Sequence, residues 1–286
     1  MRLGRLVAAL VAAWVPLAAQ SPYDVALLPG STRSAGLAGA GVALVGDAAS
    51  MFANPAGIAT IRRLGVEASY ERYVGDRQLA SGAAALRLGH FDFGVGGQAL
   101  DAPNGSVTQP TDFLAMSDVV YRFGLLAAGT TLKYARATFG TGQADAWAGD
   151  AGLAVALFDI MALGASVQNI GGDFGGGMHL PRITRVGFTM NYVDPQGTAR
   201  LLTTIEGRWQ VGQSAMLAVG AEGGIVARGV GIVARVGASG QPAATEGSAV
   251  TVGGGIELGR LHLDYAYRAY RAPGTPRHRF GVRWAP

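Results

Sequence analysis

Apolar and polar residues alternate in short segments along most of this chain, from about residue 64 to the C-terminus. The segment 261–268 is a clear example, because every second residue in it is a large apolar or aromatic one. Its apolar set is Leu261, Leu263, Tyr265 and Tyr267, and its polar set is His262, Asp264 and Arg268. A period of two is the period of a β-strand with one apolar and one polar face. The pattern therefore predicts an all-β protein.

We predict about fourteen such strands. Hydrophobic residues make up 49% of the chain and charged residues 15%, and the mean hydropathy is +0.26. This is apolar for a soluble protein, yet no run reaches the roughly 18 apolar residues of a membrane-spanning helix. A transmembrane antiparallel β-barrel explains both facts, because its apolar residues occupy alternate positions and its strand number is even. The expected strands are 64–73, 77–88, 90–100, 112–122, 125–138, 143–157, 159–170, 182–193, 198–210, 213–224, 229–239, 247–258, 259–270 and 277–285.

The two faces of each strand are expected to have different surroundings. In a barrel the apolar face contacts lipid and the polar face lines the lumen. A soluble β-sandwich also alternates, but its polar faces are solvated and carry charge. Here the polar faces contain mainly Gly, Ser, Thr and Gln, with few lysines. That composition favours a crowded lumen over a solvated surface.

The N-terminal part of the chain differs from the rest. Arg2 and Arg5 precede an apolar stretch at 6–17 and small residues after it, which is the order of a secretory signal peptide. We predict a signal peptide at 1–20, cleaved near Ala19 or Gln20, and hence export to the bacterial cell outer membrane. Residues 21–62 do not alternate and contain a helical-looking stretch at 47–61. We expect 21–62 to form a hatch in the lumen of a barrel made by 63–286.

The links between the predicted strands fall into two classes. Tight links occur at 74–76, at Gly89 and at 258–260, and longer Gly- and Pro-rich links occur at 101–111, 171–181, 240–247 and 271–276. Barrels place short turns on the periplasmic side and long loops outside. Because short and long links do not alternate regularly here, the pattern does not assign every loop to a side.

Candidate chemistry is sparse. The chain has no cysteine, and its four histidines lie on separate predicted elements without ligand spacing. We therefore expect no metal site and no cofactor. The formal charge is +4, and no basic run is longer than Arg62–Arg63, so the electrostatic footprint of a nucleic-acid-binding protein is missing. The Gly-rich stretch 171–177 lacks the Lys-Ser/Thr end of a phosphate loop. We predict that the protein is not an enzyme.

Charged residues on the polar faces are the candidate lumenal side chains. The first and last strands must pair to close a barrel, which places Glu67 and Glu71 beside Arg279 and Arg283. One interpretation is a set of structural ion pairs that fill the lumen and anchor the hatch. The other is contact with a substrate. The lumen-facing candidates are Glu67, Glu71, Asp92, Glu206, Asp264, Arg279 and Arg283.

Several short sequence motifs resemble those of one family of barrels. AGAGVAL at 38–44 and GDAASMFANPAG at 46–57 resemble the N-terminal motif of FadL-like barrels, the long-chain fatty-acid transporter superfamily, and of the related PorV/PorQ outer-membrane proteins. The resemblance extends along nearly the whole mature chain. Its further matches are GASVQNIG at 164–171, GGGIEL at 253–258, LDYAY at 263–267 and HRF at 278–280.

The resemblance implies one of two functions. FadL-like proteins pass hydrophobic molecules across the outer membrane, usually releasing them sideways through a gap in the barrel wall. PorV-like and PorQ-like proteins serve type IX protein secretion as cargo carriers or components. The implied partners are outer-membrane lipid with a hydrophobic small molecule in the first case, and secretion-system proteins in the second.

The resemblance also implies that the hatch motif Asn54, Pro55, Ala56 and Gly57 occupies the lumen and gates it. From the residues alone, Asn54 can hold a turn through its side chain, Pro55 favours a helix start, and Gly57 permits close backbone approach. A capped turn without any role in transport explains the same residues equally well.

Overall fold

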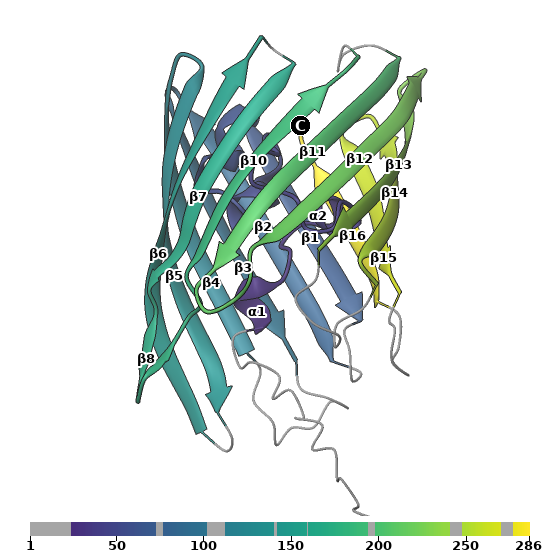
Figure 1. Ribbon diagram of the computed structural model, residues 1–286. Coiled ribbons are helices and arrows are strands. Elements are labelled where there is room, and N and C mark those ends of the chain that lie inside the picture. Colours follow the sequence, from purple (N-terminus) through teal and green to yellow (C-terminus); the bar gives the residue numbers. More distant parts are fainter. Residues whose placement is uncertain are drawn as a thin grey trace, which may run out of the picture.

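A computed structural model describes residues 24–72, 77–101, 112–139, 142–158, 160–193, 198–240, 248–269 and 277–286. Fourteen antiparallel strands form one closed barrel, with the first strand paired to the last (Figure 1). The predicted signal peptide at 1–20 lies outside the described residues. No helix among the described residues is long and apolar enough to cross a membrane.

Four short helical elements precede the first strand. They are α1 (Asp24–Leu27), α2 (Thr32–Gly36), and the 3-10 helices η1 (Ala48–Phe52) and η2 (Pro55–Thr60). The barrel strands are β1 (Leu64–Arg72), β2 (Gln78–Leu88), β3 (Phe91–Leu100), β4 (Asp112–Phe123), β5 (Leu126–Phe139), β6 (Gly142–Leu157), β7 (Met161–Gly171), β10 (Ile183–Asn191), β11 (Ala199–Gln210), β12 (Met216–Ala227), β13 (Val230–Ser239), β14 (Val250–Leu258), β15 (Leu261–Arg268) and β16 (Arg277–Trp284). A separate two-stranded sheet is made by β8 (Asp173–Gly175) and β9 (Met178–His179).

The predicted strands are confirmed in number, order and face. The largest shift is at β12, which begins and ends three residues later than the predicted 213–224. Burial alternates along β1, where Glu67 and Glu71 are buried and Val66 and Tyr70 are exposed. The apolar face is therefore the outer one. Sequence reasoning missed the β8–β9 hairpin, whose strands are too short to show a period of two, and the two helices before residue 40.

The predicted longer links lie at one end of the barrel, and the predicted tight links at Gly89 and 258–260 lie at the other. Successive strands run up and down in turn, so every second link shares an end. Gly89, Gly124 and Gly259 lie at hairpin turns of one end, each with a φ close to +61°, which L-residues with a side chain rarely adopt. The predicted longer links all fall at the other end. Residues 102–111, 241–247 and 270–276 there lie outside the described residues, as does the predicted tight link 74–76.

The short-turn end also holds the start of β1 and the end of β16. Residues 24–63, here called the N-terminal segment, run through the interior of the barrel toward that end (Figure 1). The segment begins with α1 near the long-link end, where Val25 packs in one cluster with Leu100 and Leu114. Farther along, α2 contacts β13 to β16, and η2 contacts β3 to β7. The predicted helical stretch 47–61 is found as η1 and η2.

Glycines in the wall let the N-terminal segment approach closely. A Cβ at Gly164 of β7 would lie 2.1 Å from the carbonyl oxygen of Val42, and a Cβ at Gly237 of β13 would lie 2.4 Å from the carbonyl carbon of Leu37. Real Cβ atoms essentially never make such contacts. Backbone of the segment therefore lies directly on backbone of the wall at both points.

We expect Gly164→Ala to destabilise the protein by about 1–3 kcal/mol, because the added methyl group overpacks a rigid backbone contact. The matched control is Gly149→Ala in β6, where a Cβ would meet its nearest atom at an ordinary 3.6 Å. The measurement is the urea unfolding midpoint in lipid vesicles. Equal midpoints for the two variants would contradict this close contact.

Candidate lumenal site

Six charged side chains form a closed ring between the N-terminal segment and the wall. Each arginine of the ring bridges two carboxylates, and each carboxylate bridges two arginines. The six N···O distances lie between 2.5 and 2.9 Å. The members of this ion-pair ring are Arg33 of α2, Asp47, Glu222 of β12, Arg235 of β13, Asp264 of β15 and Arg283 of β16.

The ring is neutral as a whole, which is the condition for burying so many charges. Asp47 occupies the N-cap position of η1 but makes no side-chain cap, because its oxygens accept from Arg33 and Arg283. Burial alone would raise the pKa of the Asp47 carboxyl, but Arg283 and Arg33 hold that pKa below its ordinary value. The ionised Asp47 carboxylate therefore stabilises the fold at neutral pH, and this stabilisation is lost only as the pH falls through the lowered pKa.

Glu206 holds the next part of the N-terminal segment. One carboxylate oxygen accepts from the backbone N–H groups of Gly41 and Val42, at 2.7 and 2.8 Å. The other oxygen accepts from the guanidinium groups of Arg185 and Arg208. Glu206 is fully buried, so these bonds replace all of its hydration. The carboxylate fixes a loop that has no regular structure of its own.

Arg279 holds the segment near its beginning. Its guanidinium donates to the carbonyl oxygens of Pro29 and Gly30, at 2.6 and 3.0 Å. It also donates to the hydroxyls of Ser69 and Ser81 and pairs with Glu71 at 3.2 Å. The predicted pairing of Glu71 with the last strand is thus observed, and the pair is shared with the backbone of the N-terminal segment.

Asn54 joins the segment to itself and to the wall. Its side-chain N–H₂ donates to the carbonyl oxygens of Val42 and of Leu153 in β6, at 2.8 and 2.9 Å. Its side-chain oxygen accepts from the N–H of Ala56 and caps η2, in which Pro55 is the first residue. Asn54 and Ala56 are fully buried. A Cβ at Gly57 would lie 2.6 Å from the Ser50 side chain, so this glycine permits η1 and η2 to touch.

Glu67 is the exception among the predicted lumenal residues. It lies opposite Arg283 in the β1–β16 register, yet Arg283 is fully engaged by Asp47 and Asp264. Glu67 is 3% exposed, and the described groups that stabilise its carboxylate are the side chain of Ser31 and the guanidinium groups of Arg279 and Arg283, which bond more closely to other residues. Asp92, by contrast, lies apart at the short-turn end and pairs with Arg87 and Arg122.

A second polar cluster lies in the wall formed by β4 to β7. Lys133 pairs with Asp150 at 2.7 Å and donates to the side chain of Asn169. The register between β6 and β7 shifts beside Asp150, whose carboxylate accepts from the N–H of Asn169 and closes the bulge. Hydrogen-bonded strand pairs otherwise continue around the whole barrel, so the described ladder has no lateral gap.

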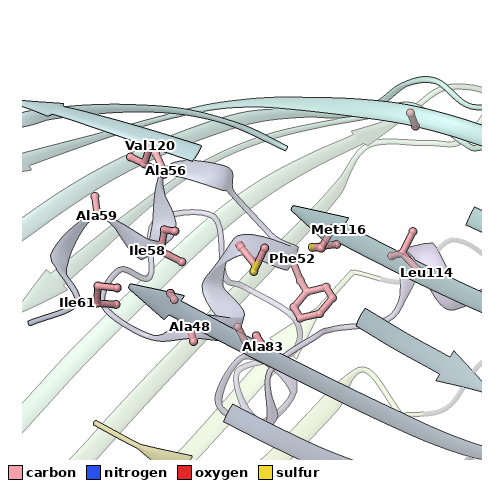
Figure 2. Packing of buried hydrophobic residues seen from close by; sticks show 14 of the residues in the cluster. Ala48, Phe52, Ala56, Ile58, Ala59, Ile61, Ala83, Leu114, Met116 and Val120 are labelled. Carbon is pink, nitrogen blue, oxygen red and sulfur yellow. The ribbon is translucent and has the colours of Figure 1, made fainter. Parts of the chain in front are cut away.

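A large apolar cluster lies inside the barrel beside these buried polar side chains. Side chains of η1 and η2, among them Met51, Phe52 and Ile58, pack on the inner faces of β2 to β6 in one buried cluster (Figure 2). Gly94 and Gly96 of β3 leave room for them, since a Cβ at either position would come within about 3.2 Å of these side chains. Wall residues in the cluster include Leu79, Ala83, Leu100, Leu114, Met116 and Val120.

A cavity of about 20 Å³ within the N-terminal segment has room for about one water molecule. It is lined by backbone and side chains that include Pro29, Ser34, Asp47 and Phe52. A cavity of this size does not admit a hydrocarbon. No group of three or more His, Asp or Glu side chains in the described ranges is arranged to hold a metal ion.

Sequence reasoning missed several members of the site. Glu222 and Arg235 occupy inward positions of β12 and β13, so alternation alone could have identified them. Arg33 lies in a segment without any period and gave no signal. The same holds for the backbone partners of Glu206 and Arg279, which depend on how an irregular segment folds.

Comparison with known proteins supports the fold. No family model matches the chain, and no curated protein matches it. Among solved structures, the toluene transporter TbuX of Ralstonia pickettii is similar with a TM-score of 0.59 and 12% identity, over 90% of this chain and 97% of that one. The toluene transporter TodX of Pseudomonas putida is similar with a TM-score of 0.57 and 12% identity, over 90% of this chain and 96% of that one.

A FadL homologue of Pseudomonas aeruginosa gives the same TM-score of 0.57 and 12% identity, with 90% of this chain and 98% of that one covered. At such identities the likeness concerns the fold. The chain therefore has the architecture of these barrels, a closed antiparallel β-barrel of fourteen strands.

We expect Glu206→Gln and Glu67→Gln to differ sharply, although both remove one buried lumenal charge. Glu206→Gln leaves Arg185 and Arg208 without their carboxylate and should cost about 3–5 kcal/mol. Glu67→Gln removes a charge that competes with Asp47 and Asp264 for Arg283, and it should be neutral or stabilising. The measurement is urea unfolding in lipid vesicles at pH 7. A larger loss for Glu67→Gln than for Glu206→Gln would contradict the pairing described above.

Proposed function

We propose that this protein is an outer-membrane channel for small hydrophobic molecules, with the N-terminal segment as its hatch. The observation that carries the proposal is the buried apolar cluster inside the barrel, between η1–η2 and β2 to β6. A barrel that conducts polar solutes has a polar, water-filled interior. An apolar lining instead favours a cargo without charge or many hydrogen-bonding groups.

Membrane insertion is supported by the outer wall. Large apolar side chains are exposed on the outer face around the barrel, which in water would be an aggregation-prone surface. In lipid the same residues are in their preferred surroundings, and the closed ladder leaves no unpaired strand edge. Examples spread over the wall are Val95, Leu132, Leu153, Val186, Ile205, Ile232, Val252 and Phe280. The proposed location is the outer membrane, reached through the predicted signal peptide.

The two sides of the lumen have different roles in this proposal. The ion-pair ring, Glu206 and Arg279 fix the part of the segment before residue 48. If any of these interactions were broken, a buried charge would be left without a partner. The contacts of η1 and η2 with β2 to β5 are mainly apolar and can be replaced by contacts with an apolar ligand. A hydrophobic molecule would therefore pass on the η1–η2 side.

Passage requires a movement, since the cavity within the N-terminal segment, at about 20 Å³, has no room for a hydrocarbon. We assign that movement to η1 and η2, which slide from the wall while the ion-pair ring stays closed. The hatch motif, with Asn54 as the link between η2 and β6, then determines how far the pair moves. No chemical step belongs to this function. The secretion-component alternative stays a prediction that no comparison tests.

A reversible lock tests the movement. The Cβ of Ala48 in η1 lies 3.7 Å from the position of a Cβ at Gly65 in β1, which suits a disulfide, and the chain has no other cysteine. In Ala48→Cys/Gly65→Cys the oxidised form should take up labelled naphthalene or oleate more slowly than the reduced form, on the order of tenfold. The assay uses bacterial cells that lack their own fatty-acid transporter.

The two single-cysteine variants are the matched controls, and their uptake should not respond to reduction. Uptake that is equally fast in the oxidised double variant would show that the start of η1 need not leave β1. Absence of uptake in the wild-type protein for both probes would contradict the proposed function itself.

A second experiment tests the membrane placement. Leu132, at the middle of β5, is 55% exposed on the outer face. Leu132→Arg should destabilise the protein in vesicles, lowering its free energy of unfolding by about 2–4 kcal/mol, because a cation then lies near the bilayer midplane. The matched control is Gln143→Arg, on the exposed face of the same hairpin near the long-link end, where little change is expected. Equal costs at both positions would contradict a lipid-facing wall.

A further inference from the structure

The short-turn end carries exposed arginines along one side of its rim. Arg228 lies in the turn between β12 and β13, Arg260 lies in the turn between β14 and β15, and Arg62 and Arg63 directly precede β1. All four side chains are exposed, and none makes a hydrogen bond or ion pair with another described residue. Because β1 pairs with β16, these positions follow one continuous arc of the rim.

Acidic groups at the same end do not neutralise this arc. Asp92 already pairs with Arg87 and Arg122, and Glu257 pairs with Arg200. Both carboxylates are buried on the inner face. The described part of the arc therefore presents positive charge outward.

Each part of the arc continues the apolar outer wall. Leu258 is 47% exposed two residues before Arg260, Val230 is 46% exposed two residues after Arg228, and Trp284 of β16 is 42% exposed between the arc's two ends. Arginines next to lipid-facing side chains extend their apolar stems along the wall and place the guanidinium at the level of the headgroups. A guanidinium binds phosphate oxygens through paired N–H donors.

We propose that Arg62, Arg63, Arg228 and Arg260 form a binding arc for anionic phospholipid headgroups in the leaflet around the short-turn end. This inference rests on the membrane placement in the proposed function. The arc follows the rim over several strands, on the order of 20 Å at the usual strand spacing. That shape, together with its continuity with the apolar wall, fits a row of lipids better than one compact acidic protein. It gives the barrel a fixed depth in the membrane at this end.

Tryptophan quenching by brominated lipids tests the proposal. Trp14→Phe/Trp147→Phe/Trp209→Phe leaves Trp284 as the only indole, at the short-turn end. In mixed vesicles, brominated phosphatidylglycerol should occupy the site beside Trp284 in preference to brominated phosphatidylcholine by about fivefold or more, the factor expected from one arginine at an anionic surface. High salt should reduce the preference.

In this background, Arg62→Gln/Arg228→Gln/Arg260→Gln should bring the preference close to one. The matched control, Arg72→Gln/Arg136→Gln/Arg182→Gln, removes three exposed arginines from the long-link end and should leave it unchanged. Equal quenching by both lipids, or a preference that survives replacement of Arg62, Arg228 and Arg260, three of the four arginines of the arc, would overturn the proposal while leaving the channel function intact. No quenching by either lipid would contradict the membrane placement as well.

Discussion

The structure depends on one constraint, which is that buried charges in the lumen must find partners. A barrel wall satisfies its own backbone but leaves the inward side chains of every strand facing a narrow interior. Here the N-terminal segment supplies the missing partners. Its backbone N–H groups meet Glu206, its carbonyl oxygens meet Arg279, and its Arg33 and Asp47 complete the ion-pair ring. The segment keeps an irregular path because these fixed partners, and not helix or strand propensity, determine its shape.

The same constraint divides the interior into two unlike halves. On the side of β10 to β16 the segment is bound by ion pairs whose separation has a large free-energy cost, since each charge would remain buried without a partner. On the side of β2 to β6 it is bound mainly by apolar contacts, among them those of Met51 and Phe52, and by single hydrogen bonds such as that of Asn54 to β6. Apolar contacts are not directional, so a hydrophobic ligand can replace them. The proposed movement of η1 and η2 would therefore open one side of the lumen without dismantling the other.

The sequence predicted the wall far better than its contents. Each strand shows the period of two because one face is apolar and the other polar, and this also located Glu71 beside Arg279 correctly. The contents follow no period. Glu67 and Arg283 are neighbours in the register, but Arg283 forms its ion pair with the carboxylate of Asp47 from the N-terminal segment. Such competition depends on a three-dimensional path that no local pattern encodes, and the β8–β9 hairpin is too short to be recognised.

The most direct test of the central claim is a cryo-electron microscopy structure of the protein in lipid nanodiscs, saturated with a hydrophobic ligand such as oleate. We expect ligand density between η1–η2 and the inner faces of β2 to β6, with the Arg33–Glu222 and Arg283–Asp47 pairs still closed. Ligand density among the ion pairs, or an unchanged and fully packed interior at saturating ligand, would contradict the account.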